Sequence, residues 1–229
     1  MKITVHKELT EYSPAKVQFF RIDPEDVAAT LADILRVLMN SSWLNKFDED
    51  YEKKAFASRS QKTIDDIKCK FDQCIDDSIT KDAGEYVVSE LARETLIDKL
   101  DYLDIPLAEL VGKKRSGNPG FDFHSQNKIT DTVIFGEAKY VAKTTAYSSA
   151  LPQMVEFIRD GKDIEDLPEL KPFCTPLALQ KAADGIKGFS AAFSAKSTVT
   201  DKIIESIVKR TDFQHLLQYE EIILVAVDL

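Results

Sequence analysis

Three ionisable residues stand in two short runs that otherwise consist mainly of aromatic, β-branched and small side chains. Asp122 lies within Gly-Phe-Asp-Phe, and Glu137 and Lys139 lie within Val-Ile-Phe-Gly-Glu-Ala-Lys. Burying an acid or a lysine among apolar residues is costly unless its charge is paired or bound to a metal. Two carboxylates beside a lysine can hold a divalent cation, or they can form an inert buried ion pair. We take these three residues as the candidate site.

The two runs predict a β-hairpin that brings the three residues together. Residues 125–128, Ser-Gln-Asn-Lys, have the composition of a turn. Side chains alternate along a strand, so Glu137 and Lys139 are predicted on one face and Ala138 on the other. Asp122 is predicted in the middle of the first strand, level with Glu137 if the strands pair symmetrically.

This arrangement resembles the bipartite motif of the PD-(D/E)XK nuclease superfamily. The motif is carried by Asp122 and by Glu137-Ala138-Lys139, and each part lies in a strand-like run. The resemblance implies a restriction-endonuclease-like fold in which Asp122 and Glu137 hold Mg²⁺ and Lys139 positions or activates the attacking water. It also implies that such a site hydrolyses phosphodiester bonds.

A narrower resemblance covers about residues 84–154. The phrases Gly-Phe-Asp and Gly-Glu-Ala-Lys, followed by a Ser/Ala-rich helix, are similar to the nuclease subunit of the Hachiman anti-phage defence system. This resemblance implies a DNA endonuclease that is the effector of a bacterial defence system and acts with a helicase or ATPase partner subunit. The substrate implied is DNA.

Hydrolysis of a phosphodiester needs an activated water and neutralisation of a charge-rich transition state. Asp122, Glu137 and the main-chain carbonyl of Ala138 would supply hard oxygen ligands for Mg²⁺, and Mn²⁺ could substitute. The pKa of Lys139 could fall through burial or rise through the neighbouring acids. The alternative is a buried ion pair without function. Replacing such a pair by apolar residues is often neutral or stabilising, so three charges in one place favour a functional site over an inert ion pair.

Two further polar residues are candidates by position. A helix is predicted over residues 84–102, and Glu85 at its start is either a further metal-site acid or a helix-capping charge. A second helix is predicted over residues 144–159, after the hairpin, and Gln153 is the polar residue that the family resemblance would bring to the site. Pro152 would kink this helix or mark its start.

Basic segments offer two possible contacts for nucleic acid. Residues 113–117, Lys-Lys-Arg-Ser-Gly, precede Asp122 and could contact phosphates or could be ordinary solvated surface. Helices are predicted over residues 177–195 and 200–210. The basic residues of this part of the chain form either a DNA-facing flank or ordinary helix surface; they are Lys181, Lys187, Lys196, Lys202, Lys209 and Arg210.

The fold class expected is α/β, a mixed central sheet flanked by helices with a helical N-terminal region. Residues 1–82 are predicted as a mostly helical region packed on the core, and residues 83–229 as the nuclease core. Within the first region, residues 2–6 and 16–21 look extended and could form a hairpin or an edge strand, and a helix begins after Asp23-Pro24-Glu25-Asp26. Residues 160–176 are predicted as an irregular connection, and 221–228 as a strand buried on both faces.

Composition limits the alternatives. The 229 residues carry a net charge of −9, mostly from residues 1–112, which argues against tight unaided binding of nucleic acid. Three cysteines without zinc-ligand spacing and the absence of an apolar run of membrane-spanning length favour a reduced cytoplasmic location. No glycine-rich phosphate loop is present, so no organic cofactor is expected. The acidic surface also suits a rival hypothesis, a non-catalytic docking or regulatory subunit with a nuclease-like fold.

Overall fold

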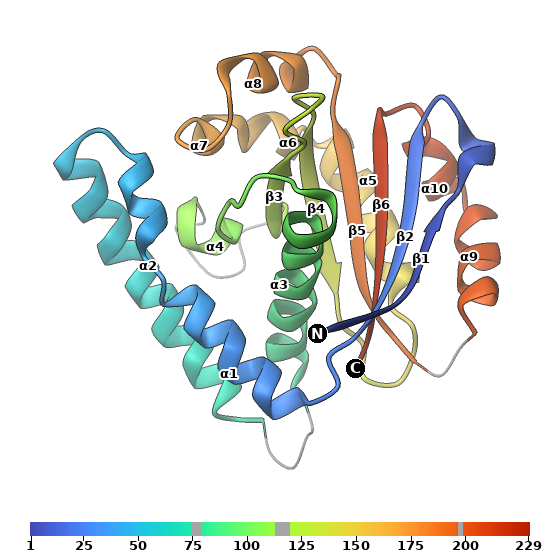
Figure 1. Cartoon of the computed structure of the whole chain (residues 1–229), viewed down its shortest axis with the longest axis horizontal. Helices are drawn as coiled ribbons and strands as arrows, with labels where there is room; N and C mark the ends of the chain where they lie inside the picture. Colours follow the sequence, from blue (N-terminus) through green and yellow to red (C-terminus); the bar gives the residue numbers. More distant parts are fainter. Residues whose placement is uncertain (75–78, 113–119, 197–198) are drawn as a thin grey trace.

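A single mixed β-sheet forms the centre of the computed structural model, which describes residues 1–74, 79–112, 120–196 and 199–229 (Figure 1). The strand order is β1-β2-β6-β5-β4-β3. Strands β2, β6, β5 and β4 are parallel, and the outer strands β1 and β3 are antiparallel to their neighbours. The predicted α/β class with a mixed sheet is therefore confirmed. The strands are β1 (Lys2–Glu8), β2 (Lys16–Asp23), β3 (Phe123–Gln126), β4 (Val133–Lys139), β5 (Gly188–Ala195) and β6 (Glu221–Asp228).

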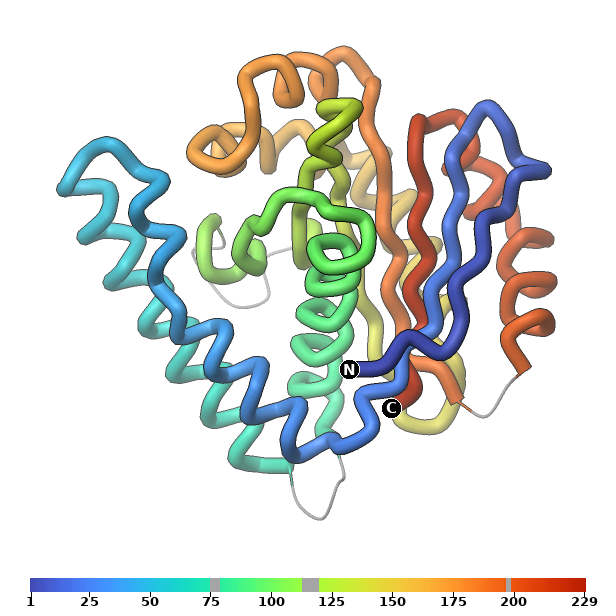
Figure 2. The backbone as a smooth tube through the Cα atoms, viewed as in Figure 1, coloured from blue at the N-terminus to red at the C-terminus, as the bar shows by residue number. Residues whose placement is uncertain are grey.

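Helices cover both faces of the sheet, as Figures 1 and 2 show. One face packs against α3 (Lys81–Leu100), with α1 (Val27–Leu38) and α2 (Asp50–Phe71) outside it. The other face packs against α5 (Tyr147–Arg159), α9 (Thr200–Val208) and α10 (Thr211–Leu216). The remaining helices are η1 (Thr10–Tyr12), η2 (Ser42–Lys46), α4 (Ala108–Val111), α6 (Lys162–Glu165), α7 (Leu167–Leu170) and α8 (Pro176–Ala183).

The N-terminal region begins with strands, which corrects the expectation of a helical layer there. β1 lies at the sheet edge, and β2 lies between β1 and β6, in the same sheet as the candidate site. Phe19, Phe20 and Ile22 in β2 are fully buried because helices cover both faces of this strand. The first α-helix, α1, begins at Val27, where Asp26 caps it by accepting a hydrogen bond from the Ala29 N–H at 2.8 Å.

The helix predicted over residues 177–195 is wrong. The chain forms the short helix α8 and then turns at Gly185, which has a positive φ of 91°, into the central strand β5. The sequence Gly-Phe-Ser-Ala-Ala-Phe-Ser-Ala spaces Phe189 and Phe193 as a helix would. Its small residues nevertheless suit a strand on which helices pack closely from both faces, and all eight residues are buried.

Most other elements agree with their predictions. The strand β6, the helix α9 and the extended N-terminal runs are present, whereas the connection 160–176 contains α6 and α7. Pro152 lies inside α5 and does not mark its start. The basic residues 113–117 lie outside the described part of the chain. None of the described helices combines the length and apolar composition that a membrane span requires.

Candidate functional site

Asp122 lies beside Glu137, although it is not in a strand. The prediction that Asp122 sits in the middle of β3 is wrong, because β3 begins at Phe123. The turn of the hairpin starts after Gln126, two residues later than predicted. The Asp122 N–H donates to the Gly136 carbonyl at 2.8 Å, and its Oδ2 accepts from the Ala138 N–H at 2.8 Å. These two bonds reach main-chain groups on either side of Glu137. The predicted level of Asp122 is therefore confirmed.

Glu137 and Lys139 share one face of β4, as the alternation predicts. The Lys139 Nζ lies 2.7 Å from Glu137 Oε1. The Glu137 side chain is 1% exposed and that of Lys139 is 19% exposed, so the acid is in the protein interior and the lysine reaches toward solvent. Since the strand ends at Lys139, the pair stands at the carboxyl end of a parallel strand, where α/β sheets commonly bind ligands.

Gly136 holds the hairpin in the geometry that places Asp122. The ring of Phe123 lies over Gly136, its partner in the β3–β4 register, and a Cβ at Gly136 would collide with that ring. A side chain there would push β3 away from β4 and move Asp122 with it. The glycine in the Gly-Glu-Ala-Lys phrase thus has a packing reason independent of chemistry.

Glu85 belongs to the same site. α3 begins at Lys81, capped by Thr80, whose hydroxyl accepts from the Ala83 N–H at 3.3 Å. Glu85 therefore begins the second turn, and its interpretation as a capping charge is wrong. Gly84 lies against the ring of Tyr140, the residue after β4, which brings this end of α3 to the end of the strand.

The charges of these groups act on one another. Burial raises the pKa of Glu85, Lys139 lowers it in part, and Asp122 raises it further. Burial lowers the pKa of Lys139, but Glu137, Asp122 and Glu85 together outweigh burial and raise it above its ordinary value. Lys139 is therefore a protonated cation at neutral pH, and the question that the sequence left open is answered in that direction.

Two further polar residues on neighbouring elements, Gln153 of α5 and His124 of β3, form no hydrogen bond with these acids within the described ranges. Gln153 lies half-buried in the second turn of α5, and no hydrogen bond among the described residues joins it to Asp122, Glu137 or Lys139. His124 is buried between aromatic rings, and its Nε2 lies 3.0 Å from Asp166 Oδ2. His124 therefore has a packing role, whereas the place of Gln153 beside the acids stays a prediction.

The donor set suits a magnesium ion better than a fully caged metal. Within the described ranges, no group of three His, Cys, Asp or Glu residues has a metal-ligating arrangement. Zinc normally requires such a set, whereas Mg²⁺ keeps several waters and takes one or two carboxylates from the protein. Asp122, whose Oδ2 accepts from the N–H of the residue after Glu137, and Glu137 itself supply two carboxylates and fit the second case.

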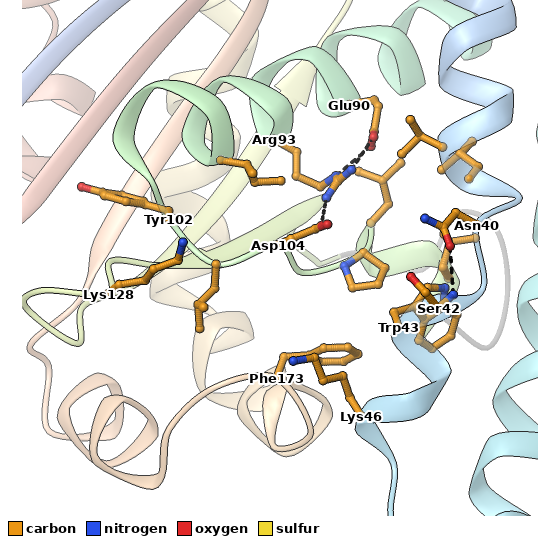
Figure 3. Close-up of a pocket in the computed structure, with 17 residues that line it drawn as sticks. Asn40, Ser42, Trp43, Lys46, Glu90, Arg93, Tyr102, Asp104, Lys128 and Phe173 are labelled. Atoms are coloured by element: carbon orange, nitrogen blue, oxygen red, sulfur yellow. Dashed lines mark hydrogen bonds and ion pairs between the residues drawn. The ribbon is translucent and has the colours of Figure 1, made fainter.

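A separate cavity of about 340 Å³ lies on the α3 side of the sheet and contains an ion-pair network that sequence reasoning missed (Figure 3). Arg93, which is buried, donates to Glu90 Oε1 at 2.5 Å and Oε2 at 2.9 Å and also pairs with Asp104. Trp43 and Phe173 form its aromatic wall. The i,i+3 spacing of Glu90 and Arg93 in the predicted helix was the sequence feature that could have indicated this ion pair. Because Arg93 and Glu90 satisfy each other, we regard this network as structural.

The chain was compared with protein-family models, curated proteins and solved structures, and none of the three comparisons gives a significant match. A functional assignment therefore depends on the geometry of the residues themselves.

Proposed function

We propose that the protein is a Mg²⁺-dependent DNA endonuclease with a restriction-endonuclease-like fold. The observation that supports this most is the meeting of Asp122, Glu137, Lys139 and Glu85 at the end of β4, next to an antiparallel edge strand. An inert ion pair needs only two of these groups. Gathering Asp122, Glu137 and Glu85 around one lysine is costly, and binding of a cation by Asp122 and Glu137 explains the cluster better than an inert pair does.

Each residue has a role that its surroundings suit. Asp122, Glu137 and the Ala138 carbonyl would hold the ion, and Mn²⁺ would be expected to substitute for Mg²⁺. The bound ion would act as a Lewis acid toward the phosphate and would help to generate a hydroxide nucleophile. Lys139, which stays protonated, donates hydrogen bonds and stabilises negative charge rather than removing a proton. Glu85 would add a third carboxylate beside Lys139 and the ion, as a further metal-site acid.

The defence role is a further part of this proposal. The segments Gly-Phe-Asp and Gly-Glu-Ala-Lys resemble the nuclease subunit of the Hachiman system, which acts with a helicase. A net charge of −9 suits a nuclease whose partner supplies much of the positive surface for DNA. We accordingly propose an effector of a bacterial anti-phage defence system that receives DNA from a helicase partner.

Plasmid cleavage tests the proposal. The wild-type chain, alone and with the helicase partner, is expected to nick or degrade plasmid DNA in Mg²⁺ but not in EDTA. The double variant Glu137→Ala, Lys139→Ala is expected to be inactive.

The matched control is Lys162→Ala with Glu165→Ala, because this lysine and glutamate also pair, at 2.6 Å, but on an exposed surface. This control should keep full activity. Equal cleavage by the wild type and the Glu137→Ala, Lys139→Ala variant, or no cleavage by the wild type with or without its partner, would contradict the assignment.

A docking or regulatory subunit is the second candidate, favoured by the acidic surface and by the helical layer of α1 and α2 outside α3. The two functions differ in metal binding. Titration calorimetry with Mn²⁺ should show binding that Asp122→Ala removes if the nuclease proposal holds. Absence of metal binding by a folded wild-type protein favours the docking function.

A further inference from the structure

A basic pocket of about 500 Å³ lies beyond the carboxyl ends of β4 and β5, at the same end of the strands as the candidate site. Three lysines line it, from the connection after β4, from the end of β5 and from α9. Its other lining residues are four that carry hydroxyl groups and one isoleucine, and none of the acids in the described ranges lines it. The lining residues are Lys143, Thr144, Thr145, Tyr147, Lys196, Lys202, Ile203 and Ser206. In a chain with a net charge of −9, this pocket is a local concentration of positive charge.

Hydrogen bonds fix the wall of the pocket that follows β4. The Val141 N–H donates to Ser194 Oγ and the Ala146 N–H donates to the Ser194 carbonyl, both at 2.9 Å. The Lys196 N–H donates to Thr145 Oγ1 at 3.3 Å. The connection after β4 is thereby attached to the end of β5, so the positions from which its side chains project are defined by the fold.

Two helices begin at this pocket without a side-chain cap. α5 starts at Tyr147 after Ala146, and α9 starts at Thr200 after Val199, and neither preceding residue has a capping side-chain hydrogen bond. The first N–H groups of a helix carry partial positive charge and bind anions well. The one acid in the first turn of α9, Asp201, pairs instead with Lys7 at 2.5 Å.

The lysines are available for a ligand to different degrees. Lys143 and Lys202 are exposed, and neither forms an ion pair within the described part of the chain. Lys196 donates to the main-chain carbonyl of Leu229 and is half-buried. Two lysines with open donors, next to hydroxyl groups and two helix N-termini, form a site suited to a phosphate group.

The register of the sheet relates this pocket to the acids. Lys139 is opposite Phe193 in the β4–β5 pairing, and Lys196 follows Phe193 by three positions along β5. At a rise of ~3.3 Å per residue this separation is about 10 Å along the strands. The pocket therefore lies too far along the sheet to hold the scissile phosphate itself and would contact a neighbouring phosphate of the same DNA strand.

We propose that this pocket binds a backbone phosphate of the DNA strand that is cleaved at Asp122 and Glu137, an inference that rests on the proposed nuclease function. Lys143 and Lys202 are positioning residues, which contact the phosphate by charge and read no base. The cleaved DNA strand thus runs across the carboxyl end of the β-sheet, from the hairpin β3–β4 toward α9.

The test measures DNA binding without divalent metal, so that no cleavage takes place. A fluorescein-labelled short duplex is titrated with protein at several salt concentrations, and fluorescence anisotropy gives the dissociation constant at each. The double variant Lys143→Ala, Lys202→Ala should bind more weakly, and the slope of log K against log salt should fall in magnitude by about 1 unit, because the two lysines contact one phosphate.

The matched control is Lys62→Ala with Lys68→Ala, two exposed lysines on α2 at the opposite face of the sheet. This control removes the same charge and should leave the slope unchanged. An equal fall in both variants, an unchanged slope in the pocket variant, or no DNA binding by the wild type would each overturn the inference.

A parallel cleavage assay in Mg²⁺ separates the two proposals. If the wild type cleaves DNA and the pocket variant cleaves with an unchanged KM, the nuclease proposal stands and the pocket inference fails. If DNA binding depends on Lys143 and Lys202 but the wild type cleaves nothing, the nuclease proposal fails while the phosphate contact is retained.

Discussion

Removing the cation from the Glu137–Lys139 pair should destabilise the fold by an amount that divalent metal partly restores. Glu137 is 1% exposed and lies 2.7 Å from the lysine. Removing one partner of a buried ion pair costs about 3–5 kcal/mol, and the partial exposure of Lys139 places Lys139→Ala near the lower end, at about 3 kcal/mol. In a chain of this size that corresponds to a fall of about 9 °C in Tm.

A matched lysine shows how much of this loss belongs to burial of the acid. Lys70 lies 2.7 Å from Asp66 and is 18% exposed, similar to Lys139, but its partner acid is 48% exposed. Lys70 also lies over the ring of Tyr86, 5.0 Å from its centroid. Lys70→Ala should therefore cost only about 1 kcal/mol.

Urea unfolding with and without Mg²⁺ provides the assay. A ligand at 100 times its Kd stabilises the folded state by about 2.7 kcal/mol. Mg²⁺ should stabilise Lys139→Ala more than the wild type, because in the variant the ion also replaces the missing charge. The reasoning is refuted if Lys139→Ala unfolds at the wild-type urea concentration, or if Mg²⁺ shifts neither protein.

Three further predictions follow from particular contacts. Asp122→Asn keeps an acceptor for the Ala138 N–H, so the free energy of unfolding should change by less than about 0.5 kcal/mol. Its Mg²⁺ affinity in calorimetry should fall at least about tenfold, and a normal affinity would show that Asp122 is not a ligand. Gly136→Val forces a side chain into the ring of Phe123 and should cost about 1–3 kcal/mol in urea unfolding, and a neutral effect would contradict the packing described. Burial and then Glu90 raise the pKa of Glu94 to about 7 from 4.5, so the native state holds a proton that the unfolded chain has lost. The free energy of unfolding should therefore fall as pH rises from about 5 to about 8. Urea unfolding of Glu94→Gln should show a smaller fall over this range, and the same pH dependence in both proteins would contradict the prediction.

The candidate site could be predicted from sequence because strand alternation and motif spacing are local properties. The position of Glu137 and Lys139 on one face depends only on their separation by two residues. The place of Asp122 was less certain because turn length is set by side-chain hydrogen bonds. Asn127 Oδ1 accepts from the N–H groups of Ile129 and Thr130 and holds the turn after Gln126, later in the chain than its composition predicts.

The elements that sequence reasoning missed depend on tertiary packing. The small residues of β5 favour a helix in isolation, and only its position between β4 and β6 makes a strand the better solution. Likewise, Arg93 and Glu90 lie on the side of α3 that would face solvent if α1 and α2 did not cover it. The burial of Arg93 and Glu90 thus depends on segments that are distant in the sequence, and a local sequence pattern does not predict it.

The most direct measurement of the central claim is the position of a bound metal. Crystals grown with Mn²⁺ and measured at the manganese absorption edge would locate the ion by its anomalous signal. We predict a peak about 2.1 Å from carboxylate oxygens of both Asp122 and Glu137, lost in Asp122→Asn. An ion bound elsewhere in the wild type, or Glu137 contacting Lys139 alone with metal in excess, would contradict the proposed site.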